Sequence, residues 1–128
     1  MMTASVSVRI EGANAVKSVL LQEQRWLLKK VEQGVLKATQ FLKREVVQSI
    51  AGGRSEHPSV DTGHYMDTIG YKARSGVGEV FSLVKYAPFL EYGTSRTSPR
   101  MHFRNSLERN RRKIKEIIEV QVKKKGAI

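Results

Sequence analysis

Residues 85–107 read KYAPFLEYGTSRTSPRMHFRNSL, and this stretch decides how the rest of the chain is arranged. Its first half, YAPFLEYGT, follows an apolar strand-like segment, places three aromatic side chains around one carboxylate and stops just after a glycine. Pro88 suits the first turn of a short helix, where its missing N–H is not needed. Gly93 suits a left-handed cap at the end of that helix. The stretch therefore predicts a helical turn between a strand and a loop, with Phe89 and Tyr92 on one face.

Residues 95–100 are polar and basic, which predicts an exposed loop. Beyond the loop, one helix is expected from about Pro99 to Lys124, a length of roughly 39 Å if it is fully helical. Its apolar residues recur at helical spacing and form a single stripe. The stripe consists of Phe103, Leu107, Ile114, Ile117, Ile118 and Val122.

Upstream, valine and isoleucine alternate with polar residues over residues 6–10, which predicts a short half-buried strand. From residue 14 to about residue 50, apolar residues recur at three- and four-residue steps. This spacing predicts a long amphipathic helix, with a break near residues 21–24 as an alternative. Gly34 inside the helix costs about 1 kcal/mol relative to alanine, so it indicates close packing against another element. Trp26 is the chain's single tryptophan and is expected in the core, with an interface anchor as the alternative.

The next segment, AGGRSEHPS, ends the helix with two glycines and a proline, which predicts a flexible surface loop. Two strands follow over residues 66–73 and 78–84, joined by a glycine-rich turn, and the second strand is expected to be covered on both faces. We predict a single α+β domain over residues 1–128. In it, a long N-terminal amphipathic helix and a C-terminal helix pack on a small antiparallel sheet, loop 51–60 is flexible, and the basic tail 123–128 is disordered.

Positive charge is concentrated towards the C-terminus. The chain has 23 lysine and arginine residues against 12 aspartate and glutamate residues, a formal charge of +11. Residues 96–125 contain eleven basic and three acidic residues, a net charge of +8. Such a concentration favours a polyanion or an acidic protein surface as a partner. If DNA is that partner, the expected contacts are Arg104, Arg109, Arg111, Arg112, Lys113 and Lys115.

The chain lacks the residues that several kinds of functional site require. The chain has no cysteine, which excludes disulfides and thiolate metal sites. His57, His64 and His102 lie in separate segments without metal-site spacing, and there is no glycine-rich phosphate loop. No metal, cofactor or small-molecule substrate is therefore expected. No apolar run approaches the ~18 residues of a membrane span, so neither secretion nor membrane insertion is expected.

Two carboxylates have an alternative interpretation as catalytic groups. The segment DTG at residues 61–63 also occurs in aspartic proteases, where two copies bring two carboxylates together. One copy in so short a chain instead predicts a turn capped by Asp61. Glu91 lies among aromatic residues and resembles an acid with a raised pKa. Ion pairs with Arg96 and Arg100 are the preferred account of Glu91, so no enzymatic activity is expected.

The order of these segments resembles a known family. The run Tyr-Ala-x-Phe-x-Glu-Tyr-Gly-Thr at residues 86–94 follows a strand and precedes a short basic loop, a proline and the run Phe-Arg-x-x-Leu at residues 103–107. This order is similar to that of the head-tail joining proteins of long-tailed double-stranded DNA phages and prophages, which are also called tail-completion, neck or minor tail proteins. Residues 60–66, VDTGHYM, are similar to the family's Asp-Thr-Gly-x-Leu segment.

The resemblance implies a virion structural protein that works by binding alone. Copies of the chain would assemble into a ring, hexameric by the same resemblance, that completes the tail and joins it to the head connector. The implied partners are further copies of the chain, the head connector, the tail-tube proteins and the genomic DNA in the lumen. The implied location is the virion neck or tail, after synthesis in the cytoplasm of the bacterial host.

Interface residues are expected in the segment that carries the resemblance. They are Tyr86, Phe89, Leu90, Glu91, Tyr92, Thr94, Arg96 and Arg100. Core packing is an equally good account of the aromatic members, because phenylalanine and tyrosine are commonly buried.

Two other functions stay open. A non-specific nucleic-acid-binding protein would lay its basic C-terminal helix along phosphates, although no groove-reading motif accompanies the charge. A helix on a membrane surface is the least favoured, because the C-terminal stripe lacks tryptophan and is typical of a core-facing helix. The assembly protein is therefore the leading prediction.

Overall fold

The computed structural model describes residues 5–12, 25–60 and 64–124. They form an α+β fold with a three-stranded antiparallel sheet in the order β1-β3-β2, which confirms the predicted fold class. The elements in chain order are β1 (Val6–Glu11), α2 (Arg25–Ala51), α3 (His64–Asp67), β2 (Gly70–Arg74), β3 (Val77–Ser82), α4 (Ala87–Tyr92), α5 (His102–Arg109) and α6 (Arg111–Lys123).

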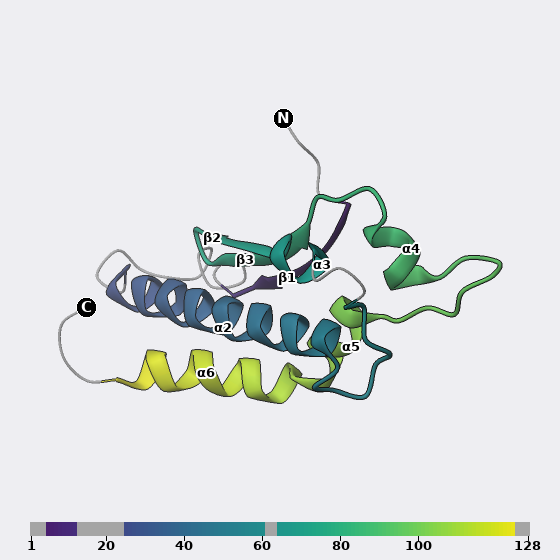
Figure 1. Ribbon diagram of the computed structural model, residues 1–128. Helices are drawn as coiled ribbons and strands as arrows, with labels where there is room; N and C mark the ends of the chain where they lie inside the picture. Colours follow the sequence, from purple (N-terminus) through teal and green to yellow (C-terminus); the bar gives the residue numbers. More distant parts are fainter. Residues whose placement is uncertain (1–4, 13–24, 61–63, 125–128) are drawn as a thin grey trace.

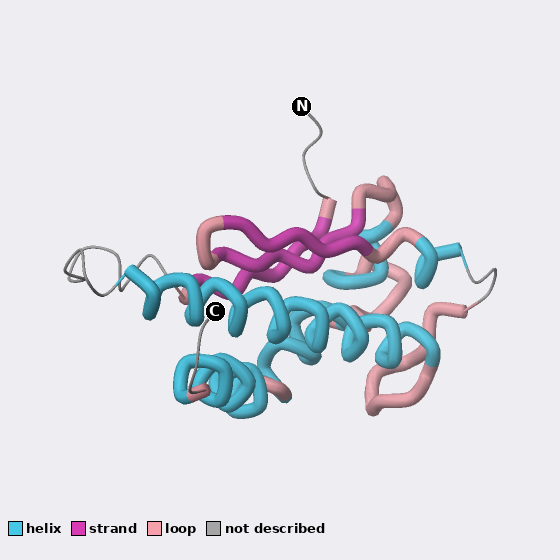
Figure 2. The backbone as a smooth tube through the Cα atoms, turned by 90° about the vertical axis from the view of Figure 1, so that its left-hand side faces the viewer, coloured by secondary structure: helices cyan, strands magenta, loops and turns pink. Residues whose placement is uncertain are grey.

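The long helix α2 is the middle of three layers. Figure 1 shows the sheet on one side of α2 and α6 running along the other, and Figure 2 shows the same order after a turn of 90°. A helix in this position needs apolar residues around much of its circumference. The residues of α2 with no exposed area include Val35, Ala38, Leu42, Val46 and Ile50.

Two glycines set the spacing between these layers. A Cβ on Gly34 would lie 2.9 Å from Cα of Ile118, so glycine lets α2 and α6 approach backbone to backbone. The close packing predicted from Gly34 is thus confirmed. A Cβ on Gly78 in β3 would overlap the Thr39 hydroxyl of α2, so glycine also brings the central strand close to the helix.

The hairpin is shorter than the sequence pattern predicts. Met66 lies in the short helix α3, and β2 begins only at Gly70. The chain turns between them because the Thr68 hydroxyl donates to the carbonyl of Tyr65 at 2.7 Å. The turn between β2 and β3 has positive φ at both central residues, as a tight hairpin turn requires.

The sheet is well covered on one face only. Val80 and Ser82 of β3 are fully buried, whereas Phe81 between them is partly buried and Leu83 is exposed. The prediction that both faces of β3 are covered is therefore wrong. The predicted strand at residues 6–10 is confirmed, since β1 pairs with β3 along its whole length.

The C-terminal segment forms two helices instead of the predicted single one. α5 begins at His102, after Met101 in a left-handed conformation, and the chain bends at Asn110. The Asn110 amide donates to the carbonyl of Ser106 at 2.8 Å and to Glu45 of α2 at 3.1 Å. Local bonds of this kind compete with helical hydrogen bonds. The predicted apolar stripe is present across both helices, because all six of its members belong to the core or pack against it.

Trp26 is not in the core, contrary to the prediction. Its side chain is 53% exposed in the first turn of α2, and the ammonium of Lys30 lies 5.1 Å from the ring centroid. A helix end offers less cover than a helix centre, and a residue type alone does not reveal that position.

Three predictions concern segments that lie wholly or partly outside the described residues. These parts are residues 14–24 of the long helix, the DTG segment at residues 61–63 and residues 125–128 of the tail. Among the helices of the described ranges, none is both long and apolar enough to cross a membrane.

Candidate functional site

The helix α4 lies where the sequence predicts a helical turn. Pro88 lies in its first turn, and Gly93 follows its last residue with φ 79° and ψ 176°. The φ is positive as expected, but the extended ψ differs from the predicted left-handed cap. A Cβ on Gly93 would lie 2.7 Å from the carbonyl oxygen of Thr97 and 2.8 Å from the nitrogen of Pro99. Glycine is thus required because the loop returns so closely.

The loop after α4 is closed by its own hydrogen bonds. The Thr94 hydroxyl accepts the N–H groups of Arg96 and Thr97, both at 3.1 Å. The N–H of Arg100 donates to the carbonyl of Leu90 at 2.8 Å, which brings the loop back to α4. We call residues 86–100 the α4 arm. It extends from one end of the molecule, beyond the sheet and α2 (Figure 1).

The aromatic side chains of the α4 arm face outwards. Tyr92 is 64% exposed, Phe89 58% and Tyr86 38%. Core packing, the alternative account of these residues, therefore does not apply to Phe89 or Tyr92 within the chain. Tyr86 still contacts the body, because its ring centroid lies 5.7 Å from that of the buried Tyr65. Leu90 is partly buried against the core.

Glu91 ties the α4 arm to α5. Its side chain is only 1% exposed, and its two carboxylate oxygens accept the backbone N–H groups of Phe103 and Arg104, each at 2.9 Å. These are unpaired donors of the first turn of α5, where a carboxylate is stabilising. Burial raises the pKa of Glu91, and the two N–H groups oppose that rise. A residue so enclosed positions the arm but does not itself contact a partner.

The predicted ion pairs of Glu91 are wrong. Arg100 instead donates to the carbonyl of Pro58 at 2.9 Å and to the Ser59 hydroxyl at 2.7 Å. Arg96 is exposed and forms no ion pair within the described part of the chain. The loop end at Arg100 is therefore attached to the body, while Arg96 points its charge to solvent.

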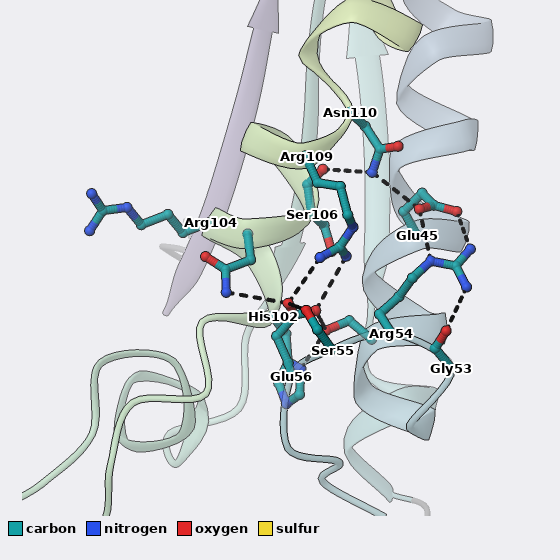
Figure 3. Close-up of polar contacts among 12 residues, drawn as sticks. Glu45, Gly53, Arg54, Ser55, Glu56, His102, Arg104, Ser106, Arg109 and Asn110 are labelled. Carbon is teal, nitrogen blue, oxygen red and sulfur yellow. Dashed lines mark hydrogen bonds and ion pairs between the residues drawn. The ribbon is translucent and has the colours of Figure 1, made fainter.

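Glu56 is the centre of a polar cluster at the base of α5 (Figure 3). Arg109 donates to both of its oxygens, at 2.9 and 3.2 Å, and the hydroxyls of Ser49 and Ser55 donate at 2.5 and 3.0 Å. Burial alone would raise the pKa of Glu56, but these donors outweigh it and lower the pKa to about 2. The predicted flexible loop 51–60 is thus held to the body at Glu56 and, through the N–H of Ser59 on the carbonyl of Ile50, at its far end.

A hydrogen-bond chain crosses the core from the α4 arm to Glu56. His102 is fully buried, with Nδ1 2.8 Å from the Ser49 hydroxyl and Nε2 2.8 Å from the Ser59 hydroxyl. An ionised Glu56 only accepts, so Ser49 gives it the hydroxyl hydrogen and accepts from Nδ1–H of His102. Ser59 then donates to Nε2 and accepts from Arg100. Each hydrogen bond in the chain has one consistent direction when His102 is neutral.

The environment keeps His102 neutral. Burial is the main cause that lowers its pKa to about 4, and the charge of Arg100 acts in the same direction. The hydrogen bond between the Ser59 hydroxyl and His102 resembles the one between a nucleophilic hydroxyl and its general base. Ser59 is only 8% exposed, however, and its oxygen is occupied by Arg100. The arrangement therefore fits a role in holding loops together better than a reaction.

The basic C-terminal residues fall into two groups. Arg109 pairs with Glu56 at 2.9 Å, Arg111 with Glu108 at 2.7 Å, and Lys115 lies 3.8 Å from Glu119. Arg104, Arg112 and Lys113 are exposed and make no ion pair among the described residues. In Figure 3 the Arg104 side chain extends away from the polar cluster. Of the six predicted DNA contacts, these three are the ones whose charge is unpaired.

In residues 5–12, 25–60 and 64–124, no three histidine or acidic side chains converge as a metal site would require. The polar cluster around Glu56 and His102 was not predicted from the sequence. Its members come from the end of α2, the following loop and α5, and no fixed spacing links them. The one available signal is a single glutamate in a glycine-rich loop of a chain whose C-terminal half is strongly basic.

Comparisons with protein-family models, with curated proteins and with solved structures found no match to this chain.

Proposed function

We propose that this protein is a structural subunit of a phage neck or upper tail, which binds copies of itself through the α4 arm. The observation that carries this proposal is the exposure of Phe89 and Tyr92 together on one short helix. Apolar side chains that gather at a surface mark interaction sites, and aromatic residues are enriched at the centre of interfaces.

The attachment of the α4 arm supports the same function. Glu91 fixes the helix of the arm to α5, and Arg100 fixes the last residue of the arm to loop 51–60. A surface that is already ordered loses little conformational freedom on binding. The arm is thus suited to repeated contact between identical subunits, and a repeated head-to-tail contact closes into a ring when its rotation permits.

The resemblance of residues 86–94 and 60–66 to head-tail joining proteins adds the biological setting. On that basis the ring completes the tail, meets the head connector and the tail-tube proteins, and surrounds the genomic DNA. The protein then belongs to the virion and catalyses no reaction. Hexameric order is part of the same proposal.

Deletion of the gene from the phage or prophage that carries it tests this function. Electron microscopy is expected to find separate heads and tails, since the joining subunit is missing. The wild-type gene should restore joined particles, whereas a copy with Phe89→Ala and Tyr92→Ala should not. Normal particles after the deletion would contradict the proposal.

Non-specific nucleic-acid binding is the second candidate, favoured by the unpaired charges of Arg104, Arg112 and Lys113. Such binding should weaken steeply as salt rises, because it depends on the release of counterions from phosphates. A fluorescence titration with duplex DNA measures it. No binding at about 50 mM salt would remove this candidate.

A further inference from the structure

A ring requires two different surfaces on each subunit. If the α4 arm bound only another α4 arm, the contact would be isologous and would stop at a dimer. The proposed function therefore calls for an acceptor elsewhere on the chain. That acceptor should be partly apolar, separate from the arm, and complementary to exposed aromatic rings and to the free charge of Arg96.

A groove between α2, α3 and β2 has these properties. It is an open groove of about 780 Å³, lined in part by the apolar side chains of Val47, Met66, Ile69 and Tyr71. Tyr71 remains 38% exposed there. The groove belongs to elements other than α4, so one subunit can offer its arm and its groove at the same time. By contrast, a depression of about 530 Å³ on the open face of the sheet is lined by Arg9, Lys72, Arg74 and Glu79 with one valine, which suits aromatic side chains less well.

The charged residues of the groove offer two cations for aromatic rings and one carboxylate for Arg96. Lys43 and Arg44 line the groove, and cations bind the faces of aromatic rings. Lys43 already does so within the chain, since its ammonium lies 5.6 Å from the ring centroid of Tyr71. Asp67 also lines the groove, is exposed and forms no ion pair within the described residues, so it can receive Arg96.

We infer that the groove between α2, α3 and β2 is the acceptor for the α4 arm of a second copy of this chain. Phe89 and Tyr92 of one subunit enter the groove of the next, beside Lys43 and Arg44, and Arg96 meets Asp67. This inference depends on the proposed self-assembly and adds the surface that receives the arm.

The test uses two variants that each damage one surface. Phe89→Ala with Tyr92→Ala removes the aromatic rings and leaves the groove intact. Lys43→Glu with Arg44→Glu reverses the charge of the groove and leaves the arm intact. A control with the same change in net charge, Arg25→Glu with Lys29→Glu, alters exposed residues at the start of α2, which belong to neither surface. Circular dichroism verifies that each full-length variant is folded, and sedimentation measures its mass over a range of concentrations.

The expected result is that wild type and the α2 control form oligomers while each surface variant alone stays monomeric. An equimolar mixture of the two surface variants should form a two-chain species and nothing larger, because one intact arm meets one intact groove. If wild type assembles and the groove variant assembles equally well, or if the mixture stays monomeric, the groove inference is wrong and the proposed self-assembly stands. Wild type that is monomeric at every concentration would overturn both.

Discussion

Two buried carboxylates organise the part of the protein that carries the candidate site. Glu91 receives the first N–H groups of α5, and Glu56 receives Arg109 and two serine hydroxyls. Buried charges are tolerated when hydrogen bonds satisfy them. Both glutamates would look like candidate acids in isolation, and their partners identify them as supports.

Glu91→Gln should lower the free energy of unfolding by about 2 kcal/mol, because the amide NH2 group would face a backbone N–H and leave a buried donor unpaired. Urea unfolding measures the change. The matched control is Glu116→Gln on the exposed side of α6, which should change stability by less than about 0.5 kcal/mol. Equal stability of Glu91→Gln and wild type would show that the two N–H bonds contribute little.

His102 should make the protein less stable as the pH falls from about 6.5 to about 4. An unfolded histidine takes up its proton near pH 6.5, whereas the folded pKa is about 4 because His102 is buried. The unfolded state therefore binds more protons within this window, and stability falls with falling pH. The loss should total about 2 kcal/mol, somewhat below the full linkage value because neighbouring hydrogen bonds can adjust.

Urea unfolding at several pH values tests this, with His102→Asn as the comparison. Burial raises the pKa of Glu91, so as the pH falls the protonation of that group opposes the loss of stability, and it does so in both proteins. The difference between the two proteins thus isolates the histidine. A slope that is equally steep in His102→Asn would assign the pH dependence to other groups.

At the scale of elements, α2 is the helix against which the other layers pack. Its burial on two sides explains why the amphipathic pattern of residues 25–51 is broad. The contact with α6 depends on Gly34, where the two backbones meet. Helix propensity alone would favour alanine at this position by about 1 kcal/mol.

Gly34→Ala should nevertheless lower stability by about 1 to 3 kcal/mol, because the added methyl overlaps the backbone of Ile118 and forces α6 away. Chemical unfolding measures the effect. Lys29→Ala, at an exposed position of the same helix, is the control and should stay within about 0.5 kcal/mol of wild type. If Gly34→Ala were more stable than wild type, the helix propensity of alanine would outweigh the clash with the backbone of Ile118.

At the scale of the whole molecule, two features favour different binding partners: the net charge favours polyanions, and the α4 arm favours another protein surface. The net charge of +11 attracts polyanions at long range. The α4 arm presents apolar rings whose burial is not screened by salt. The two effects therefore separate when the ionic strength changes.

Self-association through the α4 arm should weaken less than tenfold between about 50 and 500 mM salt, since apolar burial dominates it. Binding to DNA should fall by orders of magnitude over a similar range. Sedimentation of the protein alone and titration with duplex DNA give the two dependences. Oligomers that dissociate as steeply as a DNA complex would indicate that charge, not the aromatic arm, holds the subunits together.

Periodicity along the chain was enough to predict the α+β class, the strand at residues 6–10 and the apolar stripe of the C-terminal helices. These features follow from local spacing, because side chains on one face must share one environment. Local spacing did not reveal the bend at Asn110, the exposure of Trp26 or the helical turn at Met66. Each depends on contacts with other segments: Asn110 bonds Glu45 of α2, Thr68 beside Met66 bonds Ser82 of β3, and no other element covers Trp26 fully.

The sequence by itself determined that residues 25–51 and the C-terminal segment are helical, which residues are aromatic and where the charge lies. Only the tertiary structure decided that Phe89 and Tyr92 face solvent while Glu91 between them is enclosed, and that Glu56 and His102 connect two loops across the core. The physical reason is that burial and hydrogen-bond partners are set by residues far apart in the chain. Glu91 and Phe103 illustrate this, because neither residue's neighbours in sequence show that the carboxylate will receive the N–H of a helix that starts eleven positions later.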